Sequence, residues 1–581
     1  MKAEDKRWNM QTVYPAPDSP EYAADLENLS AVLTRIREEI TDGSASLTSL
    51  VDAWNTACDL HETMSAYTEC LVSANSVDKA GVNALNRLEA LGPEFASAGT
   101  LFRSYAAAHP DEVSAYAAEH PEYAFVLREL QKEAEHQMSR EMEELAADLI
   151  RDGADSFGRL QASVSSAACT RLDGEEKTVI ELRALATNAD REVRRKAYEA
   201  ELSVWKEHET AFAAALNGVK GTVLTLEKRR NWESPLARSV AGSRISAKTL
   251  EALIGTLEKS LPLFRKYLKT KAKLLGLEKL AFYDLFAPVG SADMRYTLEE
   301  AREFVVRQYS TFDPAMGAFA ENAFEKDWID PCPRKNKTGG AFDTYLPKAK
   351  ESRVLANFDG TYDGVATFAH ELGHAWHDHA VRNKPAMLRT YPMTLAETAS
   401  IFSEYVVFQG AVQSADDEQK KALLEMFLQN ACQVCVDILC RFYFEREVFE
   451  RRKDGELLPE DFCTLMLDCQ KKTYGEGLDE NLLHPYMWAV KSHYYSADFS
   501  FYNYPYAFGQ LFALGLYSRS QKEPGDRPFC ETYKELLLKT GQLPAEEVAA
   551  SAGIDIEDPA FWQQGIDIIA SYEKQLEAFV S

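Results

Sequence analysis

Residues 363–377 read DGVATFAHELGHAWH and contain an HExxH motif. On a helix, His370 and His374 are one turn apart, so both imidazoles leave the same face and can bind one Zn²⁺. Glu371 points about 100° away from His370, which suits a carboxylate that reaches a metal-bound water but not the metal. Apolar neighbours such as Phe368 and Leu372 favour a partly buried helix. The stretch therefore predicts a zinc helix, with a purely structural histidine pair as the alternative.

The third zinc ligand is expected on the next helix. The extended HExxHxxGxxH pattern fails, because His377 and Ala380 stand where it requires glycine and histidine. Residues 394–404, TLAETASIFSE, carry Glu397 and Glu404 two helical turns apart, on one face. Prolines between the two segments break the chain and let the second helix fold back. We expect Glu397 as the ligand and Glu404 as an acceptor for a ligand histidine N–H; two exposed helical acids are the alternative.

An aromatic run downstream is the candidate for transition-state stabilisation. Two histidines and one carboxylate leave zinc a fourth position for water, whose proton Glu371 can take during attack on a carbonyl. The tetrahedral intermediate then needs hydrogen-bond donors. Residues 493–506 contain one histidine and five tyrosines. This run predicts such donors, and an aromatic core patch is the alternative.

The rest of the chain predicts a mainly α fold. Apolar residues recur every three or four positions through the first 230 residues and again from Asp363 to the carboxyl terminus. Residues 330–340, DPCPRKNKTGG, are typical of a surface loop. Two runs that follow, 341–346 and 353–358, are expected strands. We therefore predict a small β-sheet next to the zinc helix.

Composition narrows the class of protein. The chain has 581 residues, 46% of them apolar, and a net charge of −27, which disfavours nucleic acid and membrane surfaces as partners. No apolar run approaches 18 residues, and the charged stretch Met1–Lys6 lacks the apolar core of a signal peptide. Ten scattered cysteines show no disulfide framework, and Cys432 and Cys435 are expected to be buried free thiols. We expect a soluble, cytoplasmic protein.

These motifs resemble the oligoendopeptidase F family, relatives of thimet oligopeptidase. HELGH with Glu397 in LAETASIFSE, GGAF upstream and HYY…FYNYPYAFG downstream carry the resemblance, and DREVRRKAY (190–198) and FYDL (282–285) extend it more weakly. It covers at least residues 190–517. It implies a zinc metallopeptidase that cuts short peptides internally, in a two-lobed helical clamshell with a deep channel. The amino-terminal helical region, 1–185, would precede a catalytic region, 186–581.

The resemblance also implies roles for individual residues. Zinc, one per chain, would bind His370, His374 and Glu397, with Glu371 as the catalytic glutamate. The residues that assist the transition state would be His493 and a tyrosine pair taken as Tyr502 and Tyr504. Residues 496–499 are inserted relative to the family pattern, and this insertion bears on the tyrosine assignment alone.

Substrate contacts are expected upstream of the zinc helix. In zincins of this general plan a peptide lies extended along an edge strand through main-chain hydrogen bonds. The strand at 353–358, with Ala356, is the candidate, and the loop at Gly339 and Gly340 could approach the substrate backbone. A plain hairpin is the alternative.

Two other functions stay open. A zinc carboxypeptidase or dipeptidyl carboxypeptidase would share HExxH and a downstream glutamate, but it would need a cationic group for the substrate carboxylate. A non-catalytic peptide-binding homologue would have kept the fold and lost catalysis, although all four central residues are present. The expected substrates are short, unstructured peptides cut at internal bonds.

Overall fold

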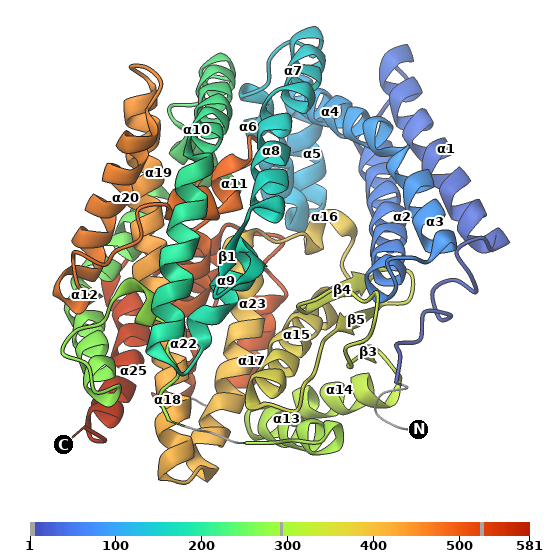
Figure 1. The fold of residues 1–581 in the computed structure, drawn as a ribbon. Coiled ribbons are helices and arrows are strands. Elements are labelled where there is room, and N and C mark those ends of the chain that lie inside the picture. Colours follow the sequence, from blue (N-terminus) through green and yellow to red (C-terminus); the bar gives the residue numbers. More distant parts are fainter. Residues whose placement is uncertain (1–5, 291–293, 523–527, 581) are drawn as a thin grey trace. The chain divides into compact units, whose positions relative to one another are not determined.

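The computed structural model describes residues 6–290, 294–522 and 528–580, and most of them are helical, which confirms the mainly α prediction (Figure 1). Met1–Asp5 of the charged amino terminus lie outside the described residues. The chain divides into two compact units, each built from three segments. Unit 1 comprises Met1–Glu135, Asp293–Gln413 and Arg519–Ile554, and unit 2 comprises His136–Ala292, Ser414–Ser518 and Asp555–Ser581.

These units differ from the consecutive regions 1–185 and 186–581 that the sequence suggested. The first break falls after Glu135. Beyond it, α7 (Arg140–Asp152) packs on α8 (Ala154–Ala167), and α8 packs on α10 (Arg191–Arg229). The helices just before residue 185 therefore belong with those after it.

Unit 1 is built on helices whose buried stripes follow the predicted periodicity. Ser19 caps the first helix by accepting a hydrogen bond from the Tyr22 amide, and Leu29, Leu33 and Ile36 are buried along one face. Its helices are α1 (Pro20–Asp42), α2 (Leu47–Ala74), α3 (Lys79–Glu89), α4 (Gly92–Ala108), α5 (Pro110–Glu119), α6 (Ala124–Glu135), α13 (Leu298–Phe312), α14 (Pro314–Glu325), α15 (Tyr362–Val381), α16 (Ala386–Arg389), α17 (Met393–Ser414), α23 (Phe529–Leu537) and α24 (Ala545–Ala550).

Unit 1 also contains a three-stranded sheet that packs on α15 (Figure 1). Its order is β3 (Ile329–Asp330), β5 (Glu351–Leu355), β4 (Phe342–Leu346), with β4 antiparallel and β3 parallel to β5. The two predicted strands are confirmed near their expected places. The prediction that the second of them forms an edge is wrong, because β5 pairs with β3 on one side and β4 on the other, which leaves β3 and β4 as the two edges.

Unit 2 contains most of the remaining helices and a hairpin that the sequence analysis missed. Strands β1 (Cys169–Leu172) and β2 (Glu175–Thr178) are joined by Asp173 and Gly174, both with positive φ, the turn chemistry of a tight hairpin. The remaining helices are α9 (Val179–Ala184), α11 (Pro235–Gly242), α12 (Ala247–Leu274), α18 (Asp417–Cys432), α19 (Ile438–Arg452), α20 (Pro459–Tyr474), α21 (Met487–Val490), most of α22 (Tyr504–Lys522), and α25 (Pro559–Glu577).

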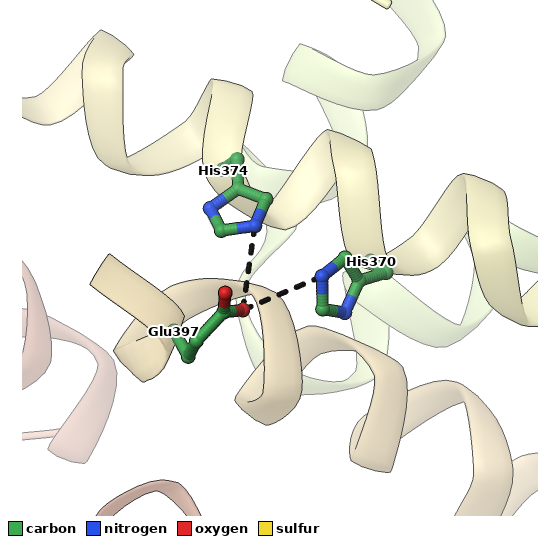
Figure 2. Close-up of side chains that lie close together, drawn as sticks. All are labelled: His370, His374 and Glu397. Atoms are coloured by element: carbon green, nitrogen blue, oxygen red, sulfur yellow. Dashed lines mark ion pairs between the residues drawn. The ribbon is translucent and has the colours of Figure 1, made fainter. Parts of the chain in front are cut away.

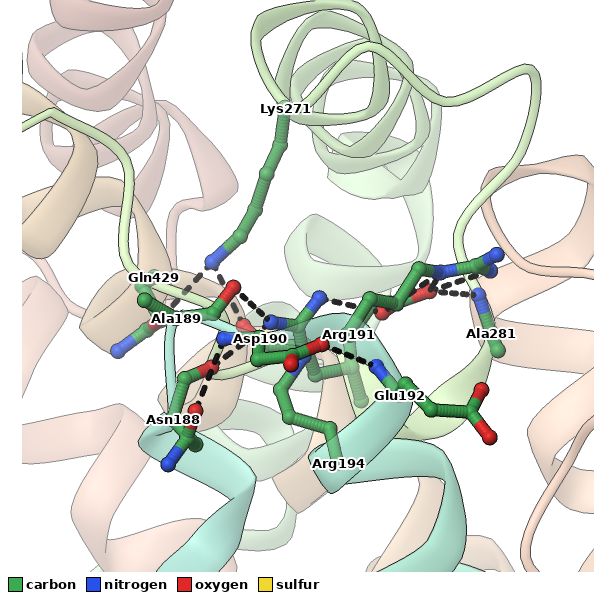
Figure 3. A network of polar contacts seen from close by, with 11 residues as sticks. Asn188, Ala189, Asp190, Arg191, Glu192, Arg194, Lys271, Ala281 and Gln429 are labelled. Carbon is green, nitrogen blue, oxygen red and sulfur yellow. Dashed lines mark hydrogen bonds and ion pairs between the residues drawn. The ribbon is translucent and has the colours of Figure 1, made fainter.

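The weaker motifs at 190–198 and 282–285 meet in unit 2 around one buried carboxylate (Figure 3). Arg191 and Arg194 donate to opposite oxygens of Asp284 at 2.9 and 2.8 Å, and the Ala281 amide donates to it at 3.0 Å. Asp284 is fully buried, so it needs this full set of partners. Both motifs therefore join α10 to the segment after α12, which is a structural role.

One long helical run in the described part of the chain, Asp417–Arg452, is apolar enough by length and composition to cross a membrane. Of its most apolar window, 67% is buried inside the protein, which is typical of a core helix. The π-helical turn η5 (Gln433–Asp437) lies within this run and carries Cys435, next to Cys432. Burial raises the pKa of both thiols, as expected for unreactive core cysteines.

Candidate metal centre

The zinc helix predicted from HExxH is α15. Thr361 caps it by accepting a hydrogen bond from the Gly364 amide at 3.3 Å. Phe368 and Leu372 are fully buried, and the Tyr309 hydroxyl donates to the Ala369 carbonyl at 2.5 Å. These contacts fix the rotation of the helix, so that its histidine face turns toward α17.

Gly373 allows α15 and α17 to approach closely. A Cβ atom at this position would lie 2.7 Å from both the Ala399 carbonyl oxygen and the Ser400 Cα, closer than real Cβ contacts occur. Those atoms belong to the backbone of α17, so they cannot rotate away. The glycine within HELGH therefore sets the helix spacing that brings Glu397 to the histidines.

His370, His374 and Glu397 converge on one point (Figure 2). Glu397 Oε2 lies 3.4 Å from His370 Nε2 and 3.4 Å from His374 Nε2. A tetrahedral zinc ion with bonds of about 2.0–2.1 Å requires its ligand atoms to be about 3.3–3.4 Å apart. The donor set and its spacing therefore fit zinc, with both histidines and the glutamate partly exposed on one side.

Further carboxylate and hydroxyl contacts orient these three side chains. Glu404 Oε2 lies 3.3 Å from His370 Nδ1, where it can accept the ring N–H and leave Nε2 free for a metal. The Ser400 hydroxyl donates to Glu397 Oε2 at 2.6 Å. The two-turn spacing of Glu397 and Glu404 thus places both on the face that meets α15.

The local field favours a cation at this point. Burial alone lowers the pKa of His370, but Glu404, Glu397 and Glu371 together raise it to about 9. Burial alone raises the pKa of Glu397, but the two histidines and Ser400 lower it to about 2. Negative charge therefore outweighs positive charge around the triad, as a divalent cation requires.

Glu371 lies next to the triad in a more buried position. Burial raises its pKa, and the Glu397 carboxylate adds to this, whereas the two histidines and the Asp343 backbone N–H oppose it. The amide of Asp343 belongs to edge strand β4. A carboxylate with a raised pKa that is held by a main-chain donor is suited to accept and return a proton.

A cavity of about 480 Å³ opens beside the triad and is walled by β4. Several of its acidic and aromatic residues are not among the side chains predicted from the sequence. Asp343 and Asp378 form a partly buried carboxyl pair, and burial, together with the nearby Asp378 carboxylate, raises the pKa of Asp343 well above its usual range. The Tyr391 hydroxyl donates to Asp378 at 3.1 Å. The cavity is lined by Glu62, Ala341, Phe342, Asp343, Thr344, Tyr345, His370, Glu371, His374, Asp378, Tyr391 and Glu397.

One of these missed residues had a signal in the sequence. Asp378 follows His374 by four residues, so the same spacing that pairs the histidines places Asp378 on their face. His377, by contrast, is fully buried with Nε2 2.8 Å from the Thr540 hydroxyl, and burial lowers its pKa to about 3. It is a neutral packing residue.

The expected substrate contacts divide into two groups. Ala356 is buried, its amide donates to the Asp330 carbonyl at 2.9 Å, and its carbonyl accepts from Lys337. Its main chain thus already has partners, which argues against the predicted role of Ala356 in substrate binding. Gly339 and Gly340 are exposed immediately before β4, and their role in substrate binding stays a prediction.

The histidine and tyrosines predicted to assist the transition state lie in unit 2. His493 is on the short helix η7 (Ser492–Tyr495), and its ring centroid is 4.9 Å from that of Tyr502. Tyr504 is fully buried, and its hydroxyl lies 2.8 Å from that of Ser243 and 3.1 Å from that of Ser239. The structure therefore groups His493 with Tyr502 and places Tyr504 in the packing of α11 and α22.

Comparison with known sequences identifies the family. A sequence profile described as Peptidase family M3 matches residues 184–568, and one described as Oligopeptidase F matches residues 106–167. The chain belongs to peptidase family M3. The predicted resemblance to oligoendopeptidase F is thereby confirmed.

Relatives of this M3 chain carry corresponding names. Oligopeptidase PepF of Bacillus subtilis is 24% identical over 447 residues, which cover 75% of the chain and 66% of that relative. An oligoendopeptidase F homolog of Lactococcus lactis is 26% identical over 404 residues, which cover 68% of the chain and 65% of that relative. The matched part of the chain thus spans just under two thirds of these relatives' length.

Solved structures share the fold of this M3 chain. Oligoendopeptidase-F from Enterococcus faecium superposes with a TM-score of 0.69 at 18% identity, covering 96% of the chain and 99% of that structure. PZ peptidase A with an inhibitor superposes with a TM-score of 0.73 at 18% identity, covering 94% and 97%.

The close approach at Gly373 yields a test. We expect Gly373→Ala to lower zinc affinity about 10–100-fold, because the new Cβ forces α17 and Glu397 away from the histidines. Gly255→Ala is the matched control, since Gly255 lies within α12 with no atom near its missing Cβ. It should keep full zinc affinity and stability. Zinc titration against a competing chelator measures the affinity of both variants, and thermal unfolding measures their stability. Wild-type zinc affinity in Gly373→Ala would show that this close helix contact does not position Glu397.

Proposed function

We propose that this protein is a zinc-dependent oligoendopeptidase that hydrolyses internal bonds of short, unstructured peptides. The observation that supports it most is the convergence of His370, His374 and Glu397 at zinc-ligand spacing, with Glu371 beside them, in a chain of family M3. Short peptides are the proposed substrates and the cytoplasm the proposed location.

Zinc, when bound, would polarise the substrate carbonyl and lower the pKa of a water molecule. Glu371 would take the proton of the attacking water and pass it to the nitrogen of the leaving amine. Its raised pKa suits both steps, because a carboxyl group whose pKa lies closer to neutral pH can both accept a proton and release it again. The Asp343 amide would keep the Glu371 carboxylate aimed during the transfer.

Strand β4 replaces the strand first expected to bind substrate. It is the edge strand that borders the cavity next to the triad, which residues 341–345 line. An extended peptide can add to such an edge through main-chain hydrogen bonds. These bonds position the scissile carbonyl and do not depend on most of the peptide's side chains. We propose β4 as the substrate-binding strand, with Gly339 and Gly340 at its entry.

The family motif further supports a role for His493 and Tyr502 as donors to the tetrahedral intermediate. Both side chains are partly exposed and their rings are adjacent. The burial of Tyr504 and its two serine contacts argue against the same role for that hydroxyl. The proposal therefore keeps Tyr502 and gives Tyr504 a packing role.

Two glutamate variants separate metal binding from proton transfer. Glu397→Ala should lose zinc, because two histidines alone bind it weakly. Glu371→Gln should keep zinc and lose about 10²–10⁴-fold in kcat, the usual contribution of a general base. Glu418→Gln, at an exposed side chain of α18, is the control and should change neither. Elemental analysis measures the zinc content, and cleavage of a quenched peptide measures kcat. A near-normal kcat in Glu371→Gln would show that Glu371 is not the general base.

Substrate size and cleavage position test the reaction class. We expect internal cleavage of unstructured peptides up to roughly two dozen residues and no cleavage of folded domains, since a peptide must be extended to join an edge strand. A peptide ladder, a folded domain and its unfolded variant are incubated with the enzyme, and products are mapped by mass spectrometry. Release of terminal single residues or dipeptides alone would favour the carboxypeptidase alternatives, and absence of any cleavage would favour the peptide-binding homologue.

The two tyrosines predict opposite results. Tyr502→Phe should lower kcat about 10²–10³-fold, the usual loss for one oxyanion donor, with stability unchanged. Tyr504→Phe should keep kcat but lose about 1 kcal/mol of stability, because Ser239 and Ser243 lose a hydrogen-bond partner. Steady-state kinetics and thermal unfolding distinguish the two. Wild-type kcat in Tyr502→Phe would show that this tyrosine is structural.

A further inference from the structure

A buried arginine contacts His493 directly. Arg441 on α19 is 7% exposed, and its Nη2 lies 2.9 Å from His493 Nδ1. A guanidinium group is always charged and can only donate hydrogen bonds. His493 Nδ1 must therefore be the acceptor in this contact, which means that it carries no proton.

This single contact settles the protonation of the ring. A neutral imidazole carries its one proton on the nitrogen that does not accept, so His493 bears it on Nε2. Among the described residues, Nε2 makes no hydrogen bond within the protein, and Tyr502 and Phe499 flank the ring. The Nε2–H group is thus a donor available to a bound molecule.

The charged groups around His493 also favour the neutral form of its ring. Burial lowers its pKa, and the positive charges of Arg441 and Lys491 lower it further, whereas Glu445 opposes them. Glu445 lies one helical turn beyond Arg441, but its two oxygens accept hydrogen bonds from Lys220 at 2.7 Å and from Asn503 at 3.0 Å. Its charge is therefore engaged elsewhere, and His493 stays neutral at physiological pH.

The same helix also anchors the segment that carries Tyr502. Asn503, held by Glu445, is fully buried and follows Tyr502 directly, and Phe501 before it has a φ of +57°. A non-glycine residue in that conformation persists only where its surroundings enforce it. Arg441 and Glu445, four residues apart on one face of α19, thus hold the two members of the His493–Tyr502 pair.

We infer that Arg441 is a positioning residue that holds His493 as the neutral Nε2–H tautomer, with that N–H presented as a hydrogen-bond donor. The inference rests on the proposed function only in giving that donor a part in catalysis. The competing interpretation is that Arg441 merely fills the core near Glu445, in which case the ring's protonation would not depend on it.

The first measurement uses the wild-type, zinc-loaded enzyme. Protein labelled with ¹⁵N-histidine is observed by two-dimensional NMR through the ring protons, and the His493 signals are assigned by their loss in His493→Gln. We expect a protonated Nε2 and an unprotonated Nδ1 across neutral pH. A protonated Nδ1 or a mixture of tautomers would overturn the inference without any variant of Arg441.

The second measurement compares Arg441→Met with Arg446→Met. Arg446 lies five residues on in α19, over the Phe442 and Tyr443 rings, so its loss removes the same charge from the same helix without touching His493. In Arg441→Met we expect a mixture of tautomers and a higher pKa for His493, because a neighbouring cation is gone. Arg446→Met should leave both as in the wild type, and an unshifted His493 in Arg441→Met would overturn the inference.

Kinetics separate this inference from the proposed function. If both hold, Arg441→Met lowers kcat with little change in KM, by less than the 10²–10³-fold expected for loss of the donor itself. Arg441→Lys, which keeps the charge but not the fixed geometry, should hold the pKa low and recover only part of kcat. If the tautomer shifts while Arg441→Met and His493→Gln both keep wild-type kcat, Arg441 still positions the ring, and the catalytic role of His493 is wrong.

Discussion

The close approach of α15 and α17 at Gly373 is the constraint on which the rest of the site depends. With no side chain at that position, the backbone of α17 reaches the zinc helix, and Glu397 arrives at 3.4 Å from both histidines. Glu404 then meets the far nitrogen of His370 two turns along the same helix. One missing methyl group thus fixes the ligand distance and the ring orientation together.

Several carboxyl groups lie around the triad, and the cost of partly burying each of them is reduced in a different way. Glu397 is balanced by two histidines, burial and the Asp378 carboxylate raise the pKa of Asp343, and Glu371 accepts a hydrogen bond from the Asp343 amide. Each solution reduces the cost of a charge away from water. The result is a cavity whose field selects cations, within a chain that carries 27 excess negative charges.

The members of the triad were predictable because helical periodicity decides which side chains share a face within each of the two helices. The spacing of four between His370 and His374, and of seven between Glu397 and Glu404, already fixes which side chains share a face. Strand order was not predictable, because β3 is only two residues long and leaves no pattern, yet it makes β5 central and β4 an edge.

Other features depended on contacts between distant segments. Tyr502 and Tyr504 look equivalent in sequence, and only the Asn503 anchor and the serines of α11 show that one faces His493 while the other is packed. The compact units could not be read from the sequence for the same reason, since each of them is assembled from three separated stretches.

Unit 1 is assembled from segments that lie far apart in the sequence, and this order affects how the chain folds during translation. His377, on the zinc helix, contacts Thr540, and α15 also packs on α23, so the support for that helix is synthesised 143 residues after Glu397. At about 5–20 residues per second, a ribosome needs about 7–30 s to add them. During that interval the three ligand residues have been made, but α23 and Thr540, which pack on the zinc helix, have not. The nascent polypeptide can therefore support the zinc helix in its final packing only after Thr540 has been made, well after the three ligand residues themselves.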